Sequence, residues 1–164
     1  VPLFGLLYNW KAVMNTSSSS SSVPSGVQGI CPTGWHVPSD DEWSILSDYV
    51  NGVSEYLCNA TSTYTAKAFA ADTTWSSSAV TCAVGNVQAD NNATGFSILP
   101  AGRARSQSSF EYFNQYAYLW SATEGSTSYT KCWGIYYAIA TVSRIGNTTG
   151  NYKYNGYSVR CVKD

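Results

Sequence analysis

The cysteines and the one histidine are the residues of this sequence whose types could support metal or thiol chemistry. No two cysteines have the Cys-x-x-Cys spacing of zinc sites and thioredoxin-like redox motifs, and a single histidine adds little to any ligand set. The sequence therefore predicts no metal site and no cofactor. Disulfides formed in an oxidising compartment explain the cysteines better. The residues concerned are Cys31, Cys58, Cys82, Cys132, Cys161 and His36.

Two disulfides are the pairing that we favour for four of the cysteines. Cys31 and Cys161 enclose almost the whole chain, and Cys58 and Cys82 bracket a stretch rich in loop residues. Spacing leaves other pairings open, because a disulfide depends on the separation of its two Cα atoms in space. With the favoured pairing, Cys132 is left as a free thiol.

Catalysis has little support among the residue types present. His36 lies between Trp35 and Val37 in an apolar segment, where a hydrogen-bonded core histidine is far more common than a general base. One buried histidine cannot supply a Ser-His-Asp triad, and the chain has no glycine-rich phosphate loop. We expect a protein that is not an enzyme and has no catalytic residues.

Charge and composition exclude two classes of interaction. The 164 residues carry a formal net charge of −1, which provides no basic surface for a phosphate backbone, so no nucleic-acid partner is expected. No apolar run approaches the roughly 20 residues of a membrane-spanning helix, so this segment should not insert into a membrane. Aromatic residues make up 15% of the chain and charged residues only 12%, which favours contact surfaces.

One helix is predicted by several independent signals. Ser39 and Glu42 form a Ser-x-x-Glu capping box, with acidic residues at the positive end of the helix dipole. Trp43, Leu46 and Val50 recur at i, i+3 and i+7, so one face of this helix should be buried. We interpret the acidic residues as helix-capping residues rather than metal ligands; they are Asp40 and Asp41.

The remaining segments predict a second short helix, a loop and several strands. The second helix covers residues 65–71, and Phe69 and Trp75 should contribute to the core. Residues 15–28 include six consecutive serines, a composition that predicts a mobile surface loop. Helices early and strands late in the chain predict one α+β domain over residues 1–164. The expected strands are residues 6–13, 35–37, 95–100, 118–120, 132–144 and 157–162.

The segment from residue 131 to residue 146 is the candidate for a binding surface. Because strand side chains alternate between two faces, every second residue should face the scaffold and the others should share the opposite face. Periodicity alone favours a ligand surface no more than an ordinary strand pair packed under a loop. The scaffold set is Trp133, Ile135 and Tyr137, then, after a change of phase near Ala138, Ala140, Val142 and Arg144. The opposite set is Cys132, Gly134 and Tyr136, then Ile139, Thr141, Ser143 and Ile145.

Five segments of the chain together resemble a known family. They are residues 5–13 (GLLYNWKAV), 29–43 (GICPTGWHVPSDDEW), 94–97 (TGFS), 120–124 (WSATE) and 157–162 (YSVRCV). In this order, and across almost the whole chain, they are similar to the Fibrobacter succinogenes major paralogous domain. The resemblance implies a disulfide-braced C-type-lectin-like fold, with two short helices and a twisted, mainly antiparallel sheet. It also implies an extracellular or cell-surface location, with any anchor outside this segment, and it implies no reaction.

Some members of this family are similar to variable proteins of diversity-generating retroelements, in which template adenines are randomised across a C-terminal stretch. An asparagine codon randomised at both adenines yields small, hydroxyl, β-branched and tyrosine residues, but no Lys, Glu, Gln, Met or Trp. The resemblance implies a diversified ligand-binding region over about residues 101–156, with a protein partner favoured over a glycan. Its contact residues would be Arg103, Arg105, Tyr118, Cys132, Gly134, Tyr136, Ala138, Ile139, Thr141, Ser143 and Ile145, and Gly146 and Thr148 also fall in the permitted set.

The same resemblance raises three other functions. A calcium-dependent lectin would need a cluster of oxygen ligands and a Glu-Pro-Asn or Gln-Pro-Asp triplet, and the chain has no such triplet. Kinship with the formylglycine-generating enzyme would require a reactive cysteine pair beside positive charge, whereas Cys132 has only Lys131 next to it. A structural or adhesive surface module without diversification stays open, because variability is not visible in one sequence.

Overall fold

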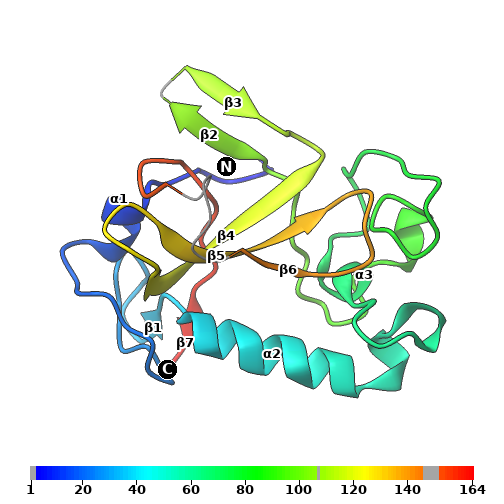
Figure 1. Ribbon diagram of the computed structural model, residues 1–164, viewed down its shortest axis with the longest axis horizontal. Helices are drawn as coiled ribbons and strands as arrows, with labels where there is room; N and C mark the ends of the chain where they lie inside the picture. Colours follow the sequence, from blue (N-terminus) through cyan, green and yellow to red (C-terminus); the bar gives the residue numbers. More distant parts are fainter. Residues whose placement is uncertain (1–2, 107, 146–151) are drawn as a thin grey trace.

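The computed structural model describes residues 3–106, 108–145 and 152–164, and these residues form three α-helices and three small antiparallel sheets (Figure 1). This confirms the predicted α+β class with one helix more than expected. Gly146 and Thr148 lie outside the described residues. The helices are α1 (Trp10–Met14), α2 (Asp40–Gly52) and α3 (Ala66–Phe69), with short 3-10 turns at Ser54–Tyr56, Cys58–Ala60 and Gln88–Asp90. The strands are β1 (Trp35–His36), β2 (Arg103–Ser106), β3 (Ser109–Glu111), β4 (Tyr116–Glu124), β5 (Thr130–Tyr136), β6 (Ser143–Ile145) and β7 (Val162–Lys163).

Helix α2 begins where the capping box predicts. The Ser39 side chain accepts a hydrogen bond from the Glu42 backbone N–H, and the Glu42 carboxylate accepts one from the Ser39 N–H. Trp43 and Val50 are buried, and Leu46 packs against the same cluster. Helix α2 therefore turns its apolar face toward the sheet. Within the described parts of the chain, no helix has the length and apolar character to cross a bilayer.

The prediction of a strand over residues 6–13 is wrong, because this segment contains helix α1. The Asn9 side chain accepts a hydrogen bond from the Ala12 N–H and so caps the helix. Trp10, Val13 and Met14 then form a buried face at i, i+3 and i+4. The apolar spacing in this short segment is compatible with either structure, and the cap selects the helix.

The central sheet joins β4, β5 and β6 in that order and separates two hydrophobic clusters. β4 and β5 are antiparallel, with Tyr116 opposite Tyr136 and Leu119 opposite Trp133, and β6 pairs with the other edge of β5. One cluster contains Trp43 of α2, Phe69 of α3, and Trp133 and Ile135 of β5, together with Trp75. The other contains Trp10 and Val13 of α1, Tyr118 and Trp120 of β4, Cys132 of β5, and Tyr157.

Two smaller sheets flank the central one. β2 and β3 form a hairpin that projects beyond the end of β4, and its register shifts between Ala104 and Ser106 (Figure 1). β1 and β7 pair near the C-terminus, with His36 opposite Val162. The expected single sheet is thus divided into three, and the predicted strand over residues 157–162 is regular only at its end.

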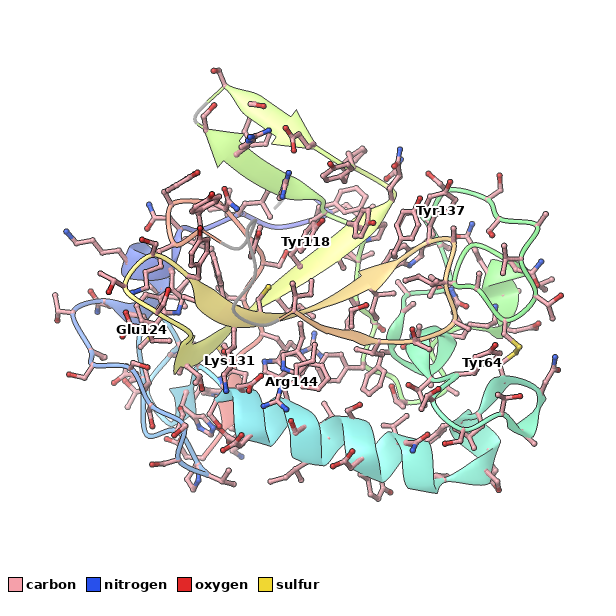
Figure 2. The ribbon with its side chains drawn as sticks, viewed as in Figure 1. Tyr64, Tyr118, Glu124, Lys131, Tyr137 and Arg144 are labelled. Carbon is pink, nitrogen blue, oxygen red and sulfur yellow. A yellow bond between two sulfur atoms is a disulfide. The ribbon has the colours of Figure 1, made fainter. Side chains whose placement is uncertain are left out.

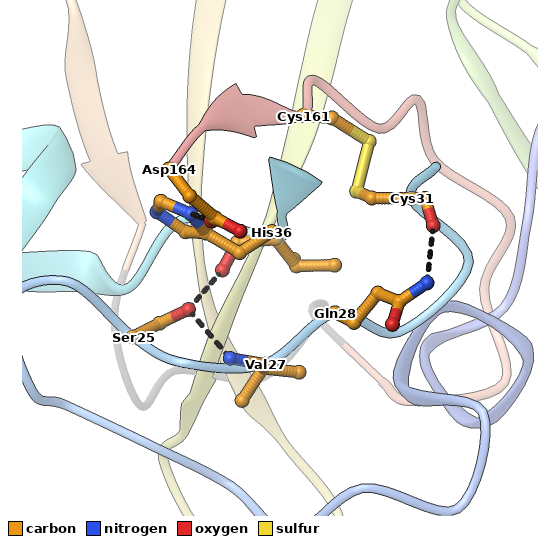
Figure 3. The surroundings of a disulfide bond; sticks show 8 residues. Ser25, Val27, Gln28, Cys31, His36, Cys161 and Asp164 are labelled. Carbon is orange, nitrogen blue, oxygen red and sulfur yellow. Dashed lines mark hydrogen bonds and ion pairs between the residues drawn. A yellow bond between two sulfur atoms is a disulfide. The ribbon is translucent and has the colours of Figure 1, made fainter. Parts of the chain in front are cut away.

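Both predicted disulfides are confirmed. Cys31 and Cys161 are bonded with Cα atoms 5.8 Å apart, and Cys58 and Cys82 are bonded with Cα atoms 5.6 Å apart. The first bond closes a sequence separation of 130 residues and joins the segment before β1 to the segment before β7 (Figure 3). Cys132 is left as a buried free thiol.

Two other segments differ from their predictions. Residues 95–100 form an isolated bridge between Ile98 and Ala70 instead of a strand, because Gly95 and Ser97 have φ angles of 73° and 56°. The loop over residues 15–28 has no regular structure, as predicted, but it is not entirely superficial. Ser25 and Val27 are buried in it, so polar composition alone did not indicate which of its residues are covered.

Candidate ligand-binding face

The side of the central sheet that faces away from α2 is the candidate binding face, and we call it the display face. Cross-strand pairs bring Tyr118 opposite Gly134, Gly134 opposite Ser143, and Cys132 opposite Ile145. Because directly paired residues share a face, the alternate set predicted from the sequence lies together. The display face consists of Tyr116, Tyr118, Trp120, Cys132, Gly134, Tyr136, Ser143 and Ile145. Ile139 and Thr141 follow in the β5–β6 connection, outside the strand pairing.

The scaffold set of the same hairpin faces the other way, as predicted. Trp133 and Ile135 are buried against α2 and α3, Ala140 is buried, and Val142 packs against the same cluster. Figure 2 shows Arg144 and Lys131 directed toward α2, on the side of the sheet opposite Tyr118. The predicted change of phase coincides with the turn at Tyr137 and Ala138, after which the alternation resumes.

Burial divides the display face into an inner and an outer half. Cys132 is 0% exposed and Tyr118 7%, and Gly134 is also buried. The Tyr157 ring covers this half, with its centroid 4.8 Å from the Tyr118 ring. Tyr118 and Cys132 share a buried cluster with Tyr157. Gly134 lies between Ile145 and Tyr118, so none of the three predicted contact residues is accessible to a ligand in this structure. Alternation distinguishes the two faces of a strand but does not show what lies above them.

The outer half of the display face is accessible. Tyr136, Ala138, Thr141, Ser143 and Ile145 are half-buried, and Ile139 is 39% exposed. Tyrosine rings line its edge. Tyr116 stacks on Tyr136 with ring centroids 4.2 Å apart, and Tyr112 lies against Tyr116 at 5.1 Å. Tyr137 of the scaffold set packs against the α2-side cluster and also contacts the Tyr136 ring, at 4.7 Å between centroids. The sequence interpretation missed Tyr112 and Tyr116 as part of this surface, and their concentration with Tyr118 within residues 112–118 was the available signal.

The β2–β3 hairpin borders the outer half and carries the two predicted arginines. Arg103 donates hydrogen bonds to Glu111 Oε2 from Nε at 3.0 Å and from Nη2 at 2.7 Å, and its guanidinium lies 5.0 Å from the Tyr112 ring centroid. These hydrogen bonds lower the pKa of Glu111. Arg103 therefore positions Tyr112. Arg105 is exposed and makes only a weak pair with Glu111, at 3.7 Å, so its guanidinium is accessible to a partner.

Aromatic side chains at the end of this hairpin are exposed. Phe110 is 70% exposed, and Phe113 packs only partly, against Phe4 at 4.6 Å between ring centroids. Large apolar side chains in such positions are common at contact surfaces. The segment thus adds exposed apolar area on either side of Tyr112 that the sequence interpretation did not identify.

Asp40 on the opposite side of the sheet has a role beyond helix capping. Its carboxylate is fully buried and accepts hydrogen bonds from Trp133 Nε1 at 3.0 Å and from Arg144 Nε, and Lys131 Nζ lies 3.1 Å away. Burial alone would raise the pKa of Asp40, but the hydrogen bonds from Arg144, Lys131 and Trp133 outweigh this effect and lower it. Asp41, by contrast, is exposed at the positive end of the helix dipole, and its contact with the sheet is a 3.8 Å pair between its Oδ1 and Arg144 Nη2.

His36 is a buried histidine with two hydrogen-bond partners, as predicted. Its Nε2 lies 2.8 Å from Glu42 Oε1 and its Nδ1 lies 2.6 Å from Asp164 Oδ1. Burial acts to lower the pKa of His36, but the hydrogen bonds to the two carboxylates raise it above its usual value. Figure 3 shows the imidazole beside Asp164, close to the Cys31–Cys161 disulfide. Among the residues described, no group of three or more His, Cys, Asp and Glu side chains is arranged to hold a metal ion.

Comparison with known proteins places the chain in a family. No curated protein and no solved structure is similar enough to the chain to count as a match. The family model described as the Fibrobacter succinogenes major domain matches residues 2–163, and it therefore covers the buried core, both disulfides and the display face. The chain belongs to the Fibrobacter succinogenes major domain family.

Proposed function

We propose that this protein is a non-catalytic ligand-binding protein and that the outer half of the display face is its contact surface. The observation that carries the proposal is the accessible cluster of Tyr112, Tyr116 and Tyr136, next to Ile139 and the exposed hairpin. Tyrosine provides large, rigid, amphipathic contact area at a low cost in conformational entropy, as in antibody paratopes. Small and hydroxyl residues beside it, such as Thr141 and Ser143, adapt the hydrogen bonding.

We further propose that the scaffold is C-type-lectin-like and that the display face is diversified by a retroelement. The split between the two faces of the hairpin supports this. Lys131 and Trp133, which adenine randomisation cannot produce, lie on the side that contacts α2, and the residues of β5 and β6 on the other side all belong to the set that it can produce. Diversification would then change the contact surface without changing the core. A reverse transcriptase and a near-identical template repeat beside the gene would support this part of the proposal.

The environment of the reactive side chains supports a function without catalysis. Burial raises the pKa of the Cys132 thiol, and the Asp40 carboxylate raises it further, which disfavours the nucleophilic thiolate. His36 is engaged by Glu42 and Asp164 and is 3% exposed. Neither side chain is available to react with a molecule bound on the display face. An extracellular or cell-surface location is part of the proposal, because the two disulfides favour an oxidising compartment.

The proposal is tested by binding to protein and glycan arrays with three forms of the chain. The wild type should bind one class of target, with proteins expected over glycans. The double variant Tyr136→Ala and Ile139→Ala should lose this binding and keep its melting temperature. A matched control, Tyr49→Ala and Ile45→Ala, removes the same residue types from exposed positions on α2 and should bind like the wild type. Equal binding by all three forms would exclude the display face as the contact surface.

A further inference from the structure

We propose that Asp40 is the positioning residue of the display face, because its side chain and backbone hold all three strands of the central sheet from the opposite side. This inference rests on the proposed function of the display face, but the experiment that tests it does not require a known ligand. Asp40 is the first residue of α2 and is 0% exposed. Its contacts to β4, β5 and β6 come from residues that are distant in the sequence.

Each strand contributes a contact to Asp40. On β4, the Thr123 hydroxyl oxygen accepts a hydrogen bond from the Asp40 backbone N–H at 3.0 Å. On β5, Trp133 Nε1 donates to the carboxylate at 3.0 Å, and Lys131 Nζ lies 3.1 Å from it. On β6, Arg144 donates to both carboxylate oxygens from Nε, and its Nη2 also contacts Oδ2. The Asp40 carboxylate thereby links the helix to β5 and β6, and the Asp40 backbone N–H links it to β4.

The contacts are placed so that they fix β6 against β5. Trp133 and Arg144 are directly opposite each other in the antiparallel pair, and both donate to the same carboxylate. β6 has only three residues and lies at the edge of the sheet, so few backbone hydrogen bonds hold it. An ion pair from Arg144 to a carboxylate fixed on a helix supplements those bonds. Arg144 also directs its neighbours Ser143 and Ile145 toward the display face.

The anchoring residues alternate along the chain with the residues of the display face. Lys131 and Trp133 flank Cys132, and Arg144 separates Ser143 from Ile145. Because alternate side chains point to opposite faces, a substitution on the display face does not touch the Asp40 contacts. The inference is that Asp40 keeps the backbone of β5 and β6 in place while the exposed side chains differ from one protein to another.

Hydrogen exchange of the backbone amides in the variant Asp40→Asn tests this role. The isosteric change removes the charge that Arg144 and Lys131 pair with, so β6 should open locally. Exchange at Ser143, Arg144 and Ile145 should accelerate at least about tenfold more than exchange at the centre of α2. The matched control is Asp41→Asn, which removes the same charge from the same helical turn but from an exposed side chain whose contact to Arg144 is a 3.8 Å pair, so that Arg144 keeps its hydrogen bonds to Asp40. It should leave the exchange of β6 close to that of the wild type.

Labelling of Cys132 by a maleimide provides a second measurement. Cys132 is a fully buried free thiol opposite Ile145, so opening of β6 should expose it. Labelling of Asp40→Asn without denaturant should be at least about tenfold faster than labelling of the wild type and of Asp41→Asn. If Asp40→Asn does not fold, Arg144→Gln replaces it, because the Arg144 side chain is about half exposed and its loss leaves Asp40 with Lys131 and Trp133.

The outcomes separate this inference from the proposed function. Selective acceleration at β6 supports the role of Asp40 whether or not an array reveals a ligand. A uniform acceleration across α2, β4 and β6 would show that Asp40 contributes only to global stability, and the inference would be wrong. Equal effects of Asp40→Asn and Asp41→Asn would also overturn it, since a loss of negative charge at the helix end would then explain both.

Discussion

The two faces of the central sheet differ in how strictly their side chains are determined. On the α2 side, Trp133 and Ile135 are buried and Arg144 is tied to Asp40, so each side chain has a specific neighbour. On the display side, burial decreases from Cys132 toward Ile139, and the outer tyrosines contact mainly one another. A close-packed face restricts substitution, whereas a half-exposed face permits it. One hairpin thus combines a fixed side and a side that permits substitution by the alternation of its residues.

The largest effect is expected for Trp133→Ala on the fixed side. This change removes a buried indole and its hydrogen bond to Asp40, so the free energy of unfolding should fall by about 3–5 kcal/mol. Urea denaturation of the variant and the wild type measures the loss. The control is Trp35→Ala, which removes the same side chain from a position that is 39% exposed and should cost clearly less. Similar losses for both variants would contradict the contrast between the faces.

Gly134→Ala tests the boundary between the two halves of the display face. An added Cβ would meet the Ala117 carbonyl oxygen and Ile145 Cδ1, both at 3.0 Å. Because the backbone carbonyl has little room to move, the overpacking should cost about 1–3 kcal/mol. Gly52→Ala is the matched control, since its Cβ would meet nothing within 4 Å, and it should be neutral or slightly stabilising. If Gly134→Ala is also neutral, the inner half of the display face tolerates substitution as well as the outer half does.

The pH dependence of folding tests the other fixed contact, His36 between Glu42 and Asp164. The folded-state pKa of His36 is raised, so its contribution is fully present below the unfolded pKa of about 6.5 and is lost as the pH rises through the folded value. Each unit of elevation contributes about 1.4 kcal/mol. Urea denaturation across neutral pH and NMR titration of this single histidine measure it. Asp164→Asn should reduce the elevation, and a folded pKa at or below the unfolded value would refute the prediction.

The smallest effect is expected for Ile139→Ala on the side that permits substitution. The side chain is 39% exposed, so the free energy of unfolding should change by less than about 1 kcal/mol. Ile135→Ala, on the fixed side of the same hairpin and 1% exposed, should cost about 2–5 kcal/mol under the same conditions. Thermal or urea denaturation compares the two. A large loss for Ile139→Ala would show that the outer half belongs to the core.

Local sequence signals predicted the parts of the fold that depend on neighbouring residues. The capping box at Ser39 and the spacing of Trp43 and Val50 predicted α2, because a cap and a helical face are complete within a few turns. The alternation from Trp133 to Arg144 predicted the two faces of the hairpin for the same reason. The segment at residues 6–13 was assigned to a strand wrongly, because its few apolar residues suit both structures and the cap at Asn9 was not recognised.

The sequence by itself determined the α+β class, the main helix, the cysteines available for pairing and which hairpin residues share a face. Only the tertiary structure decided which of those residues are accessible and what holds them in place. Tyr157 covers Cys132 and Tyr118, Asp40 meets Arg144 across 104 residues of sequence, and His36 meets Asp164 across 128. Periodicity reports the direction of a side chain relative to its own backbone. It carries no information on which distant segment returns to cover that side chain, because that depends on the packing of the whole chain.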